Sequence, residues 1–379
     1  MKVGLVCPYH IFRGGGVQEC VFAIQKELTA RGHIAKIITP LPRDVTDEDR
    51  HNESVVFVGT SANVKSPFHT TAQVSVSLDN NQMNAMLEAE QFDVLHFHEP
   101  WVPIMSRQLL TQSGAVNVAT FHAKLPETVM SKTIEKVITP YTKSVLKYID
   151  SFTAVSDAAA QYVRTVTDEP ISIVPNGIDL KKFKVIKARL VSDAPVLSFI
   201  GRLEKRKGVK YLIKAFAAYQ RVNPNAELRI AGDGPDRDKL EQLVQDERIS
   251  NVTFLGYVSE AEKQQLFEES DLFCSPALYG ESFGIVLLEA MAKGLVTIAG
   301  DNPGYAAVMD GRGALSLVNP QDTEQFARRI QILLEDEATR KLWRSWAHDY
   351  VKQFDYSLVV EQYLKVYKQA LVHEKKRRG

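Results

Sequence analysis

The sequence is poor in cysteine, has no excess of charge of either sign and contains no long apolar run. Its three cysteines, Cys7, Cys20 and Cys274, lack the spacing of metal ligands or of a disulfide framework, which predicts reduced, buried thiols. The 46 basic and 46 acidic side chains balance, which argues against nucleic acid as a partner. No stretch approaches the roughly 20 apolar residues of a membrane span, and the start of the chain does not have the form of a signal peptide. We therefore expect a cytoplasmic protein.

The sequence does contain a regular alternation of short apolar segments and helical patterns over its 379 residues. Such segments form parallel strands that helices cover on both faces. We expect two doubly wound α/β domains, because the alternation occurs twice and the length suits two domains. The expected strands are Val3–Cys7, Ile34–Ile38, Val55–Val58, Val94–Phe97, Val116–Phe121, Phe152–Val155 and Ile171–Val174 in the first domain, and Val196–Ile200, Leu228–Ala231, Val252–Leu255, Leu272–Cys274, Val296–Ala299 and Leu315–Val318 in the second.

A polar, lysine-rich stretch, Ile178–Asp193, separates the two series of strands. We assign residues 1–177 to the first domain, residues 178–194 to a linker and residues 195–356 to the second domain. Ligands of doubly wound sheets bind outside the carboxyl ends of the strands. Residues that directly follow a strand are therefore the candidates for a site.

A glycine triplet, Gly14-Gly15-Gly16, follows the first strand and precedes a helical pattern that begins at Val17. Its amides can approach a phosphate or an acceptor group without interference from a side chain. A dinucleotide-binding loop would need Gly-x-Gly-x-x-Gly and an acidic residue after the second strand, which ends here in Thr39-Pro40. The pattern therefore disfavours an oxidoreductase.

Two basic residues, Arg202 and Lys207, follow the first strand of the second domain. Arg202 offers a planar fork and Lys207 a point charge, and together they suit a diphosphate. An isolated arginine at a strand end is more often a surface residue, but its place just before a Lys-Gly pair favours binding. The side chains between the two are expected to be mostly solvated: Glu204, Lys205 and Arg206.

The segment from Leu278 to Gly300 places two carboxylates, Glu281 and Glu289, eight positions apart on a loop and the helix that follows it. Glycines at 280 and 284 let the backbone approach a ligand, and the amides of residues 282–286 open a helix whose positive end favours phosphate. A diphosphate would repel a carboxylate. We therefore expect Glu281 to bind neutral donors such as sugar hydroxyls and Glu289 to bind a ribose.

Several histidines lie at strand ends. His122 follows the strand 116–121, so the carboxyl edge of a sheet would direct it toward a ligand. The alternation of His96 and His98 is compatible with a metal site, but no third ligand occurs at a useful spacing, and we favour a structure without metal. Two acidic clusters that resemble the Asp-x-Asp motif lie in strongly polar stretches and are expected to be solvated: Asp47-Glu48-Asp49 and Asp236-Arg237-Asp238.

Motifs along nearly the whole chain resemble those of a known family. The segment 280–289 is similar to the Glu-x7-Glu motif of the retaining GT-B glycosyltransferases of family 4. Within that family, the chain most resembles the bacterial phosphatidylinositol mannosyltransferases. The motifs are Val6-Cys7-Pro8-Tyr9, Gly15-Gly16-Val17-Gln18, Phe92-Asp93-Val94-Leu95-His96, Ala119-Thr120-Phe121-His122, Ala154-Val155-Ser156-Asp157, Pro175-Asn176-Gly177-Ile178-Asp179, Gly201-Arg202-Leu203, Arg206-Lys207-Gly208 and Gly280-Glu281-Ser282-Phe283-Gly284-Ile285-Val286-Leu287.

The resemblance implies a GT-B fold, in which two Rossmann-like domains face a central cleft and a C-terminal helix, here about residues 357–372, crosses back to the first domain. The implied catalytic residues are His122, Arg202, Lys207 and Glu281. The implied donor contacts are Gly15, Gly16, Arg202, Lys207, Gly232, Tyr257, Glu281, Ser282, Phe283, Gly284, Ile285 and Glu289, and the implied acceptor contacts are Tyr9, Gln18, His122 and Lys124.

The resemblance further implies front-face transfer of a hexose with retention, mannose from GDP-mannose to phosphatidylinositol or a related lipid. The nucleotide sugar is a co-substrate, and we expect no essential cofactor or divalent metal. Two alternatives remain open. One is a family 4 transferase that uses another GDP- or UDP-sugar for polysaccharide or glycolipid synthesis. The other is a non-catalytic nucleotide-sugar-binding protein, which the complete set of Arg202, Lys207, Glu281 and Glu289 disfavours.

One segment departs from the family pattern. The mannosyltransferases carry a basic amphipathic helix that attaches to anionic membrane, whereas the corresponding segment here, Asn80–Gln91, contains Glu88 and Glu90 and no basic residue. Transient, peripheral contact with the inner face of the cell membrane would then depend on other cations. The candidates are Lys124, Lys132, Lys136 and the run Lys375-Lys376-Arg377-Arg378.

Overall fold

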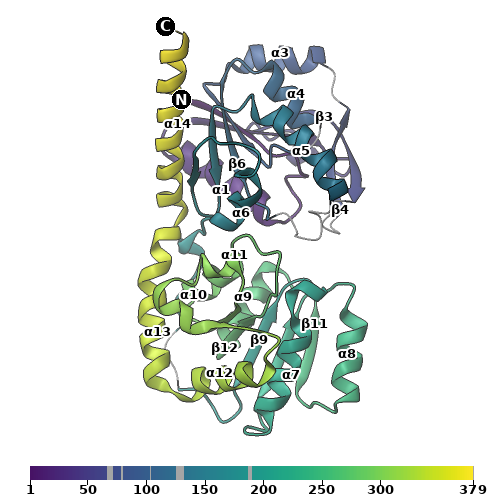
Figure 1. Cartoon of the computed structure of the whole chain (residues 1–379), viewed down its shortest axis with the longest axis vertical. Helices are drawn as coiled ribbons and strands as arrows, with labels where there is room; N and C mark the ends of the chain where they lie inside the picture. The colour runs from purple at the N-terminus through teal and green to yellow at the C-terminus, as the bar shows by residue number, and fades with distance from the viewer. Residues whose placement is uncertain (66–70, 78–79, 103, 125–131, 187–189, 379) are drawn as a thin grey trace. The chain divides into compact units, whose positions relative to one another are not determined.

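The computed structural model describes residues 1–65, 71–77, 80–102, 104–124, 132–186 and 190–378, with backbone alone for residues 60–65, 71–77, 132–138 and 375–378. The chain forms two compact units and passes between them twice, after Gly177 and after Asp355. The first unit combines Met1–Gly177 with the C-terminal helix, and the second is Ile178–Asp355 (Figure 1). Within the described residues, no helix has both the length and the apolar character needed to cross a membrane.

The first unit is built on an eight-stranded sheet with the order β4-β3-β2-β1-β5-β6-β7-β8. The seven strands expected from the sequence are present and parallel, and β4 adds an antiparallel edge beside β3 that the sequence analysis did not predict. The strands are β1 (Lys2–Val6), β2 (Ile34–Leu41), β3 (Val55–Lys65), β4 (Thr71–Ser77), β5 (Val94–His98), β6 (Val116–Phe121), β7 (Ser151–Ala154) and β8 (Ile171–Ile173).

The helices of the first unit cover this sheet. They are α1 (Gly16–Ala30), α2 (Asp47–Arg50), α3 (Asn80–Glu90), α4 (Met105–Gln112), α5 (Lys132–Leu146), α6 (Asp157–Val163) and α14 (Tyr356–Arg378). The glycine triplet precedes α1, and the helix stops where Gly32 adopts a left-handed φ of 79°. Cys20 and Val21 of α1 are fully buried against β1, so the amphipathic pattern of residues 17–30 positions the glycine loop at the sheet edge.

The C-terminal helix α14 belongs to the core of the first unit, as the resemblance implied. Val359, Val360 and Tyr363 are fully buried in the same apolar cluster as β1 and α1. Two tyrosines of α14 also reach polar groups of the sheet: the hydroxyl of Tyr367 lies 2.7 Å from Nδ1 of His96, and that of Tyr363 accepts a hydrogen bond from Thr120. Figure 1 shows α14, in yellow, alongside this unit.

The second unit contains a fully parallel sheet with the order β11-β10-β9-β12-β13-β14. All six expected strands are present. They are β9 (Val196–Ile200), β10 (Glu227–Ala231), β11 (Val252–Gly256), β12 (Leu272–Ser275), β13 (Thr297–Gly300) and β14 (Leu317–Val318). The helices are α7 (Val209–Gln220), α8 (Arg237–Asp246), α9 (Glu260–Glu269), α10 (Ile285–Ala292), α11 (Pro303–Ala306), α12 (Thr323–Glu335) and α13 (Glu337–Tyr350), with 3₁₀ turns η2 (Leu180–Lys182), η3 (Lys205–Lys207), η4 (Gly311–Ser316) and η5 (Val351–Phe354).

The start of the expected linker is attached to the second unit. The amide of Ile178 donates to the carbonyl of Phe354 at 2.8 Å, and the amide of Ile186 donates to the carbonyl of Lys293 at 2.8 Å. In this stretch, residues 187–189 lie outside the described part of the chain. The polar composition of residues 178–193 therefore reflects a surface segment that is fixed to its unit at two points.

Burial of α14 predicts how strongly the first unit depends on it. Val360→Ala should lower the free energy of unfolding by about 2 kcal/mol, because it removes two methyl groups from a fully buried position. The measurement is urea unfolding followed by circular dichroism. Leu358→Ala is the matched control on the same helix, since Leu358 is 42% exposed and should change stability by less than about 0.5 kcal/mol. Equal effects of the two substitutions would contradict this assignment.

Candidate active site

The carboxyl end of β9 leads into the basic segment 202–207. Leu203 is fully buried and its amide bonds to the carbonyl of Asp233, so the chain is fixed on both sides of Arg202, whose own side chain is exposed. In the described part of the chain Arg202 has no ion-pair partner. The turn η3 then carries Lys207 and ends at Gly208, which begins α7. The segment therefore presents Arg202 at the strand end as an exposed cation that no described carboxylate engages.

Glu281 lies among the cations of η3. Its Oε1 atom is 2.8 Å from Nζ of Lys207 and 2.6 Å from Nη1 of Arg206, and Nη2 of Arg206 is 2.6 Å from Oε1 of Glu204. The expectation that Glu204 and Arg206 are mostly solvated is wrong, because their side chains are only 13% and 29% exposed and pair across the loop. Glu281 was expected to face neutral hydroxyls, and in the structure it has two cationic partners. Lys207 and Glu281 do come together as one cluster.

Two glycines shape the loop that carries Glu281. Gly280 and Gly284 adopt φ values of 76° and 115°, in the region that side chains disfavour. A Cβ atom at Gly284 would lie 2.8 Å from the ring of Tyr305, whose buried hydroxyl bonds to Ser275 at 2.8 Å. Burial, reinforced by the nearby charge of Glu281, raises the pKa of Tyr305 well above its usual range. The loop thus turns tightly over the buried Tyr305 and leads into the first turn of α10.

The donor contact predicted for Phe283 does not fit its side chain. Phe283 is 4% exposed, and its ring lies edge-on to that of Phe354, with the ring centroids 5.9 Å apart. Ser282 and Ile285, its neighbours at the start of α10, are only partly buried, so the backbone here remains the part suited to a ligand. The phenylalanine anchors the loop from behind.

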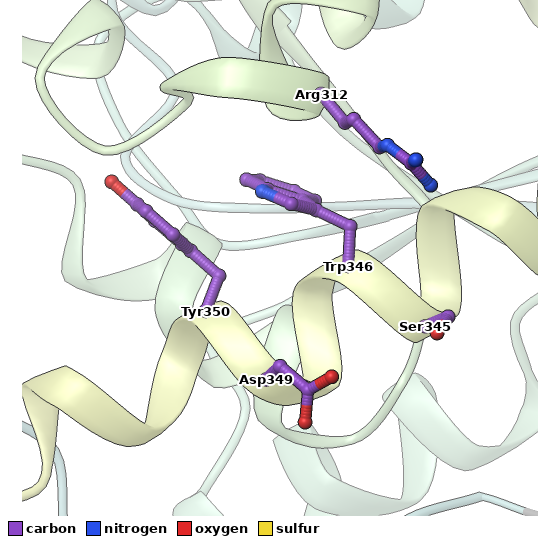
Figure 2. Close-up of a pocket in the computed structure, with 5 residues that line it drawn as sticks. All are labelled: Arg312, Ser345, Trp346, Asp349 and Tyr350. Atoms are coloured by element: carbon purple, nitrogen blue, oxygen red, sulfur yellow. The ribbon is translucent and has the colours of Figure 1, made fainter.

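The ring contacts continue from Phe354 to the surface. Phe354 packs on Tyr350, and Tyr350 stacks on Trp346 with centroids 4.9 Å apart. These two rings and Arg312 border an open hollow of about 420 Å³ on α13 (Figure 2). None of the predicted site residues lines this hollow, which lies at the far end of the aromatic contacts that support Phe283.

Glu289 is held by a residue that sequence reasoning missed. Both of its carboxylate oxygens accept from Nζ of Lys263 on α9, at 2.9 and 3.0 Å, and Lys263 also pairs with Glu260. Burial alone would lower the pKa of Lys263, but the two carboxylates raise it. Glu289 is 8% exposed on the inner side of α10. Its carboxylate is therefore fixed in direction, as a ribose contact would require.

The last two predicted donor contacts differ in character. Gly232 has a φ of 125°, and a Cβ atom there would lie 1.9 Å from the carbonyl oxygen of Gly201, so only glycine allows β10 to end against β9. Tyr257, after β11, is 87% exposed. The first supplies close backbone packing at the carboxyl edge of the sheet, and the second supplies an accessible ring beside it.

In the first unit, His122 is held by a buried carboxyl. Oε1 of Glu99 accepts from the amides of His122 and Ala123, both at 2.6 Å, and Glu99 itself adopts a left-handed φ of 57°. Glu99 is 1% exposed, and burial raises its pKa to about 8, although the two amide bonds oppose the shift. In the sequence, the only sign of this role of Glu99 is its position directly after His98, at the end of a strand. Glu99 fixes the backbone that follows β6.

The histidines of β5 and β6 form a buried polar row. Nδ1 of His98 lies 2.8 Å from Nε2 of His122, and Nε2 of His96 lies 2.6 Å from the hydroxyl of Thr120. Burial lowers the pKa of His122 to about 4 and that of His96 to about 3. All three rings are therefore neutral near pH 7, so His122 can hold a hydroxyl group but cannot supply a positive charge.

One cluster in the described residues has the composition of a metal site. Ligand atoms of Cys20, His98 and His122 lie within 4.8 Å of one another, a third ligand that the sequence spacing did not reveal. The two imidazole nitrogens, however, are 2.8 Å apart, shorter than the roughly 3.3 Å that two nitrogens bound to one tetrahedral zinc at 2.0–2.1 Å would need. Burial also raises the pKa of the Cys20 thiol to about 12. This distance is that of a hydrogen-bonded histidine pair. The absence of an essential metal stays a prediction.

The other predicted residues of the first unit follow β1 or β6 along the chain. The side-chain amide of Gln18 donates to the carbonyl of His10 at 3.4 Å, and a Cβ atom at Gly15 would lie 2.5 Å from Oε1 of Gln18. Tyr9 follows β1, and burial, followed by the charge of Glu99, raises its pKa well above its usual range. Gly16 begins α1, and Lys124 is half-buried two residues after His122. Glu99 therefore acts on both residues, through a hydrogen bond to the amide of His122 and through its charge on Tyr9.

Known proteins agree with this fold. The family model described as Glycosyltransferase Family 4 matches residues 14–182, and the model described as Glycosyl transferases group 1 matches residues 181–349. The phosphatidyl-myo-inositol mannosyltransferase of Mycolicibacterium smegmatis is 31% identical over 380 residues, which cover 97% of this chain and 93% of that protein. A glycosyltransferase from Rickettsia africae superposes with a TM-score of 0.77 at 19% identity over 98% of both chains. Anabaena HepE in complex with UDP superposes with a TM-score of 0.75 at 19% identity over 97% of this chain and all of that one.

The fold and the two matched domains define a glycosyltransferase of the GT-B class. The chain belongs to glycosyltransferase family 4.

The buried carboxyl of Glu99 predicts a pH dependence of stability. Its pKa is raised on folding, so the folded protein keeps a proton that the unfolded chain releases, and stability from this group is lost as the pH rises toward about 8. Glu99→Gln removes that titration. The unaltered protein should therefore lose stability relative to Glu99→Gln as the pH rises. Between pH 5 and pH 8 the difference in free energy of unfolding should shift by on the order of 3 kcal/mol in favour of the variant, measured by urea unfolding. The exposed Glu88→Gln is the control, and a difference for Glu99→Gln that does not change with pH would refute the prediction.

Proposed function

We propose that this glycosyltransferase moves a hexose, with retention of configuration, from a nucleoside diphosphate sugar to phosphatidylinositol, and that the donor is GDP-mannose. The observation that carries the proposal is the cluster of Lys207 with Glu281, next to the exposed Arg202, at the edge of the second sheet. The name of the relative from Mycolicibacterium smegmatis supports mannose and an inositol lipid as the substrates.

The second unit would bind the donor. Arg202 and Lys207 offer the cations for the diphosphate, and the start of α10 offers backbone amides for the same charge. Glu289, fixed by Lys263, would take the ribose hydroxyls. Glu281 would take hydroxyls of the hexose, because its carboxylate lies on the same loop as those amides.

The proposed reaction is a front-face substitution. The bond between the anomeric carbon and the phosphate oxygen breaks, the acceptor oxygen forms a bond on the same face, and its proton passes to the departing phosphate. Arg202 and Lys207 would stabilise the charge that develops on the phosphate, a role in which no divalent metal is essential. Double displacement would need a free carboxylate as the nucleophile. Glu281 and Glu289 are both engaged by cations.

The first unit would bind the acceptor and the sugar hydroxyls near it. His122 is neutral, since burial lowers its pKa to about 4, and we assign it to holding a hydroxyl of the hexose. Tyr9 and Gln18 would contact the inositol ring, and Lys124 its phosphate. The protein would meet this lipid at the inner face of the cell membrane.

The membrane contact proposed here does not use α3. Of the two carboxylates in that segment, Glu90 pairs with Lys2 at 2.7 Å and Lys36 at 2.6 Å. The helix thus presents an exposed Glu88 and no basic residue. The side chains of Lys132, Lys136 and the run 375–378 lie outside the described part of the chain, and their contribution stays a prediction.

The deciding experiment measures transfer of labelled mannose from GDP-mannose into the organic-extractable fraction, with purified protein and vesicles that contain phosphatidylinositol. Labelled lipid is the expected result. A parallel series with UDP-glucose and UDP-N-acetylglucosamine tests the second candidate, a related transferase that uses another donor for polysaccharide or glycolipid synthesis. The missing positive charge on α3 favours an acceptor of this candidate that is not part of a membrane. Folded protein that hydrolyses or transfers from a UDP-sugar and leaves GDP-mannose intact would overturn the proposed donor. Mannose transfer only to soluble acceptors would overturn the lipid.

Substitutions test the proposed roles. Arg202→Ala and Glu281→Ala should each lower kcat at least about a hundredfold, or roughly 2.7 kcal/mol, because each removes an interaction with the reacting sugar phosphate. Lys205→Ala, an exposed cation of the same segment, is the control and should keep kcat within about twofold. Near-normal turnover of either folded variant would remove that residue from the mechanism.

A further inference from the structure

The position of Arg206 in the cluster suggests a role that the proposed function does not assign. Its guanidinium spans two carboxylates, Glu204 on its own segment and Glu281 on the loop before α10. Its backbone is tied to the same loop, because its carbonyl accepts from the amide of Leu278 at 2.8 Å. A Cβ atom at Gly280 would approach Cδ of Arg206 to 3.3 Å, so the glycine there leaves room for the arginine. Arg206 is therefore built into the loop that positions Glu281.

The two cations on Glu281 are not equivalent. Nη1 of Arg206 donates an aligned hydrogen bond to Oε1 of Glu281 at 2.6 Å. Nζ of Lys207 approaches the same oxygen at 2.8 Å as an ion pair without hydrogen-bond alignment. An aligned, charge-assisted hydrogen bond is the stronger of the two contacts, and the lysine has the more flexible side chain. Lys207 is thus the partner that can leave.

The charges of the cluster are balanced. Arg206 and Lys207 carry two positive charges, and Glu204 and Glu281 carry two negative charges within 2.6–2.8 Å of them. If Lys207 turns to a diphosphate, Glu281 still has Arg206. Without Arg206, the only cation that the described residues place on Glu281 would be Lys207, and a partly buried carboxylate is costly to leave without a cation. Arg206 therefore sets how readily Lys207 can be withdrawn.

We propose that Arg206 is a positioning residue that holds Glu281 and thereby frees Lys207 to bind the diphosphate of the donor. The proposal rests on the proposed function, in which the donor is a nucleoside diphosphate sugar. It makes diphosphate affinity depend on a residue that does not touch the phosphates. It also explains why Arg206 and Lys207 are adjacent in the sequence and share one carboxylate oxygen.

The expected consequence is a rescue between two substitutions. Arg206→Met should weaken binding of a nucleoside diphosphate about tenfold, because Glu281 then holds Lys207 alone. Adding Glu281→Gln to that variant should restore the affinity to within about threefold of the unaltered protein, because Lys207 no longer faces a carboxylate. A role of Arg206 in binding phosphate directly would leave the double variant as weak as the single one.

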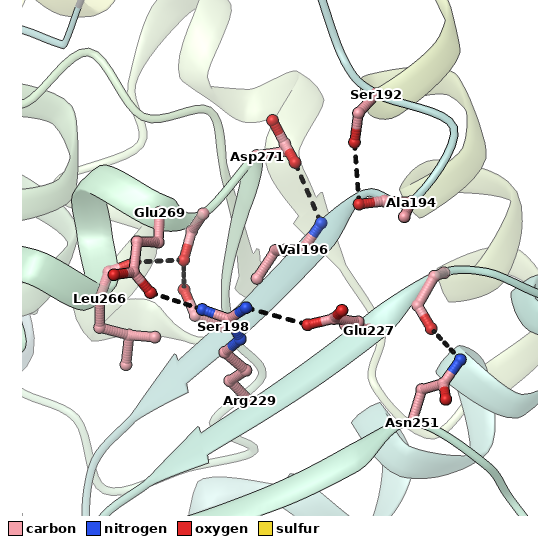
Figure 3. A network of polar contacts seen from close by, with 12 residues as sticks. Ser192, Ala194, Val196, Ser198, Glu227, Arg229, Asn251, Leu266, Glu269 and Asp271 are labelled. Carbon is pink, nitrogen blue, oxygen red and sulfur yellow. Dashed lines mark hydrogen bonds and ion pairs between the residues drawn. The ribbon is translucent and has the colours of Figure 1, made fainter.

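Arg229 offers a matched control in the same unit. It also joins two glutamates, Glu269 at 2.6 Å and Glu227 at 2.9 Å, and its side chain is 27% exposed, close to the 29% of Arg206 (Figure 3). Both partners lie outside the η3 turn, Glu227 on β10 with Arg229 itself and Glu269 at the end of α9. Arg229→Met removes the same kind of clamp without touching the cluster, and it should leave nucleotide affinity unchanged.

The experiment is titration calorimetry of GDP and of UDP into the unaltered protein, Arg206→Met, Arg206→Met with Glu281→Gln, Glu281→Gln and Arg229→Met, with thermal unfolding of each as a folding check. Weaker binding to Arg206→Met alone, with recovery in the double variant, is expected. Equal affinity of Arg206→Met and the unaltered protein, or no recovery in the double variant, would overturn the proposal and leave the donor class intact. Failure of the unaltered protein to bind either nucleotide would overturn the proposed donor and this proposal with it.

Discussion

The charge of Glu281 is the constraint on which the rest of the second unit's site depends. A carboxylate on a loop that opens helix α10 is compatible with phosphate binding nearby only if cations compensate it. The structure supplies them from the turn η3, with Arg206 and Lys207 on one oxygen and Glu204 on the other side of the arginine. Gly280 and Gly284 allow the backbone of the loop to approach that turn, and the buried side chains of Phe283 and Tyr305 pack under the loop. The shape of the loop and the charge balance of the cluster therefore depend on each other.

The first unit solves a related problem by neutralisation. Glu99 is deeper than Glu281, and burial raises its pKa to about 8, so the carboxyl is largely protonated near pH 7. It fixes the backbone at His122 through two amide bonds. The carboxyl of Glu281 is therefore paired with cations, while that of Glu99 is largely protonated and fixes the backbone after β6. The difference follows from the partners and from burial, since Glu281 has two cations beside it, whereas Glu99 is 1% exposed and accepts from backbone amides.

The sequence allowed the two sheets to be predicted almost strand by strand, because parallel strands buried on both faces are written as short apolar runs. Strand β4 was missed because an antiparallel edge strand such as Thr71–Ser77 is only half apolar. The predicted ligands Arg202, Lys207 and Glu281 stood out by spacing along the chain. Arg206 and Lys263 did not, because their meaning lies in partners 75 and 26 positions away. Sequence motifs therefore identify the residues expected to contact a ligand more easily than the residues that hold them in position.

The proposed lipid acceptor would be recognised differently from the donor, because recognition of a lipid involves both the membrane surface and the headgroup. Each basic residue near an anionic membrane contributes about 1 kcal/mol, and α3 contributes none. Its Glu90 instead binds Lys2 and Lys36, so two cations of the first unit are used within the fold. If the acceptor is phosphatidylinositol, helix α3 adds little to the affinity of the protein for the membrane surface. The contacts around Tyr9, Gln18 and Lys124 must then account for most of the selectivity, since a weak surface attraction cannot discriminate one headgroup from another.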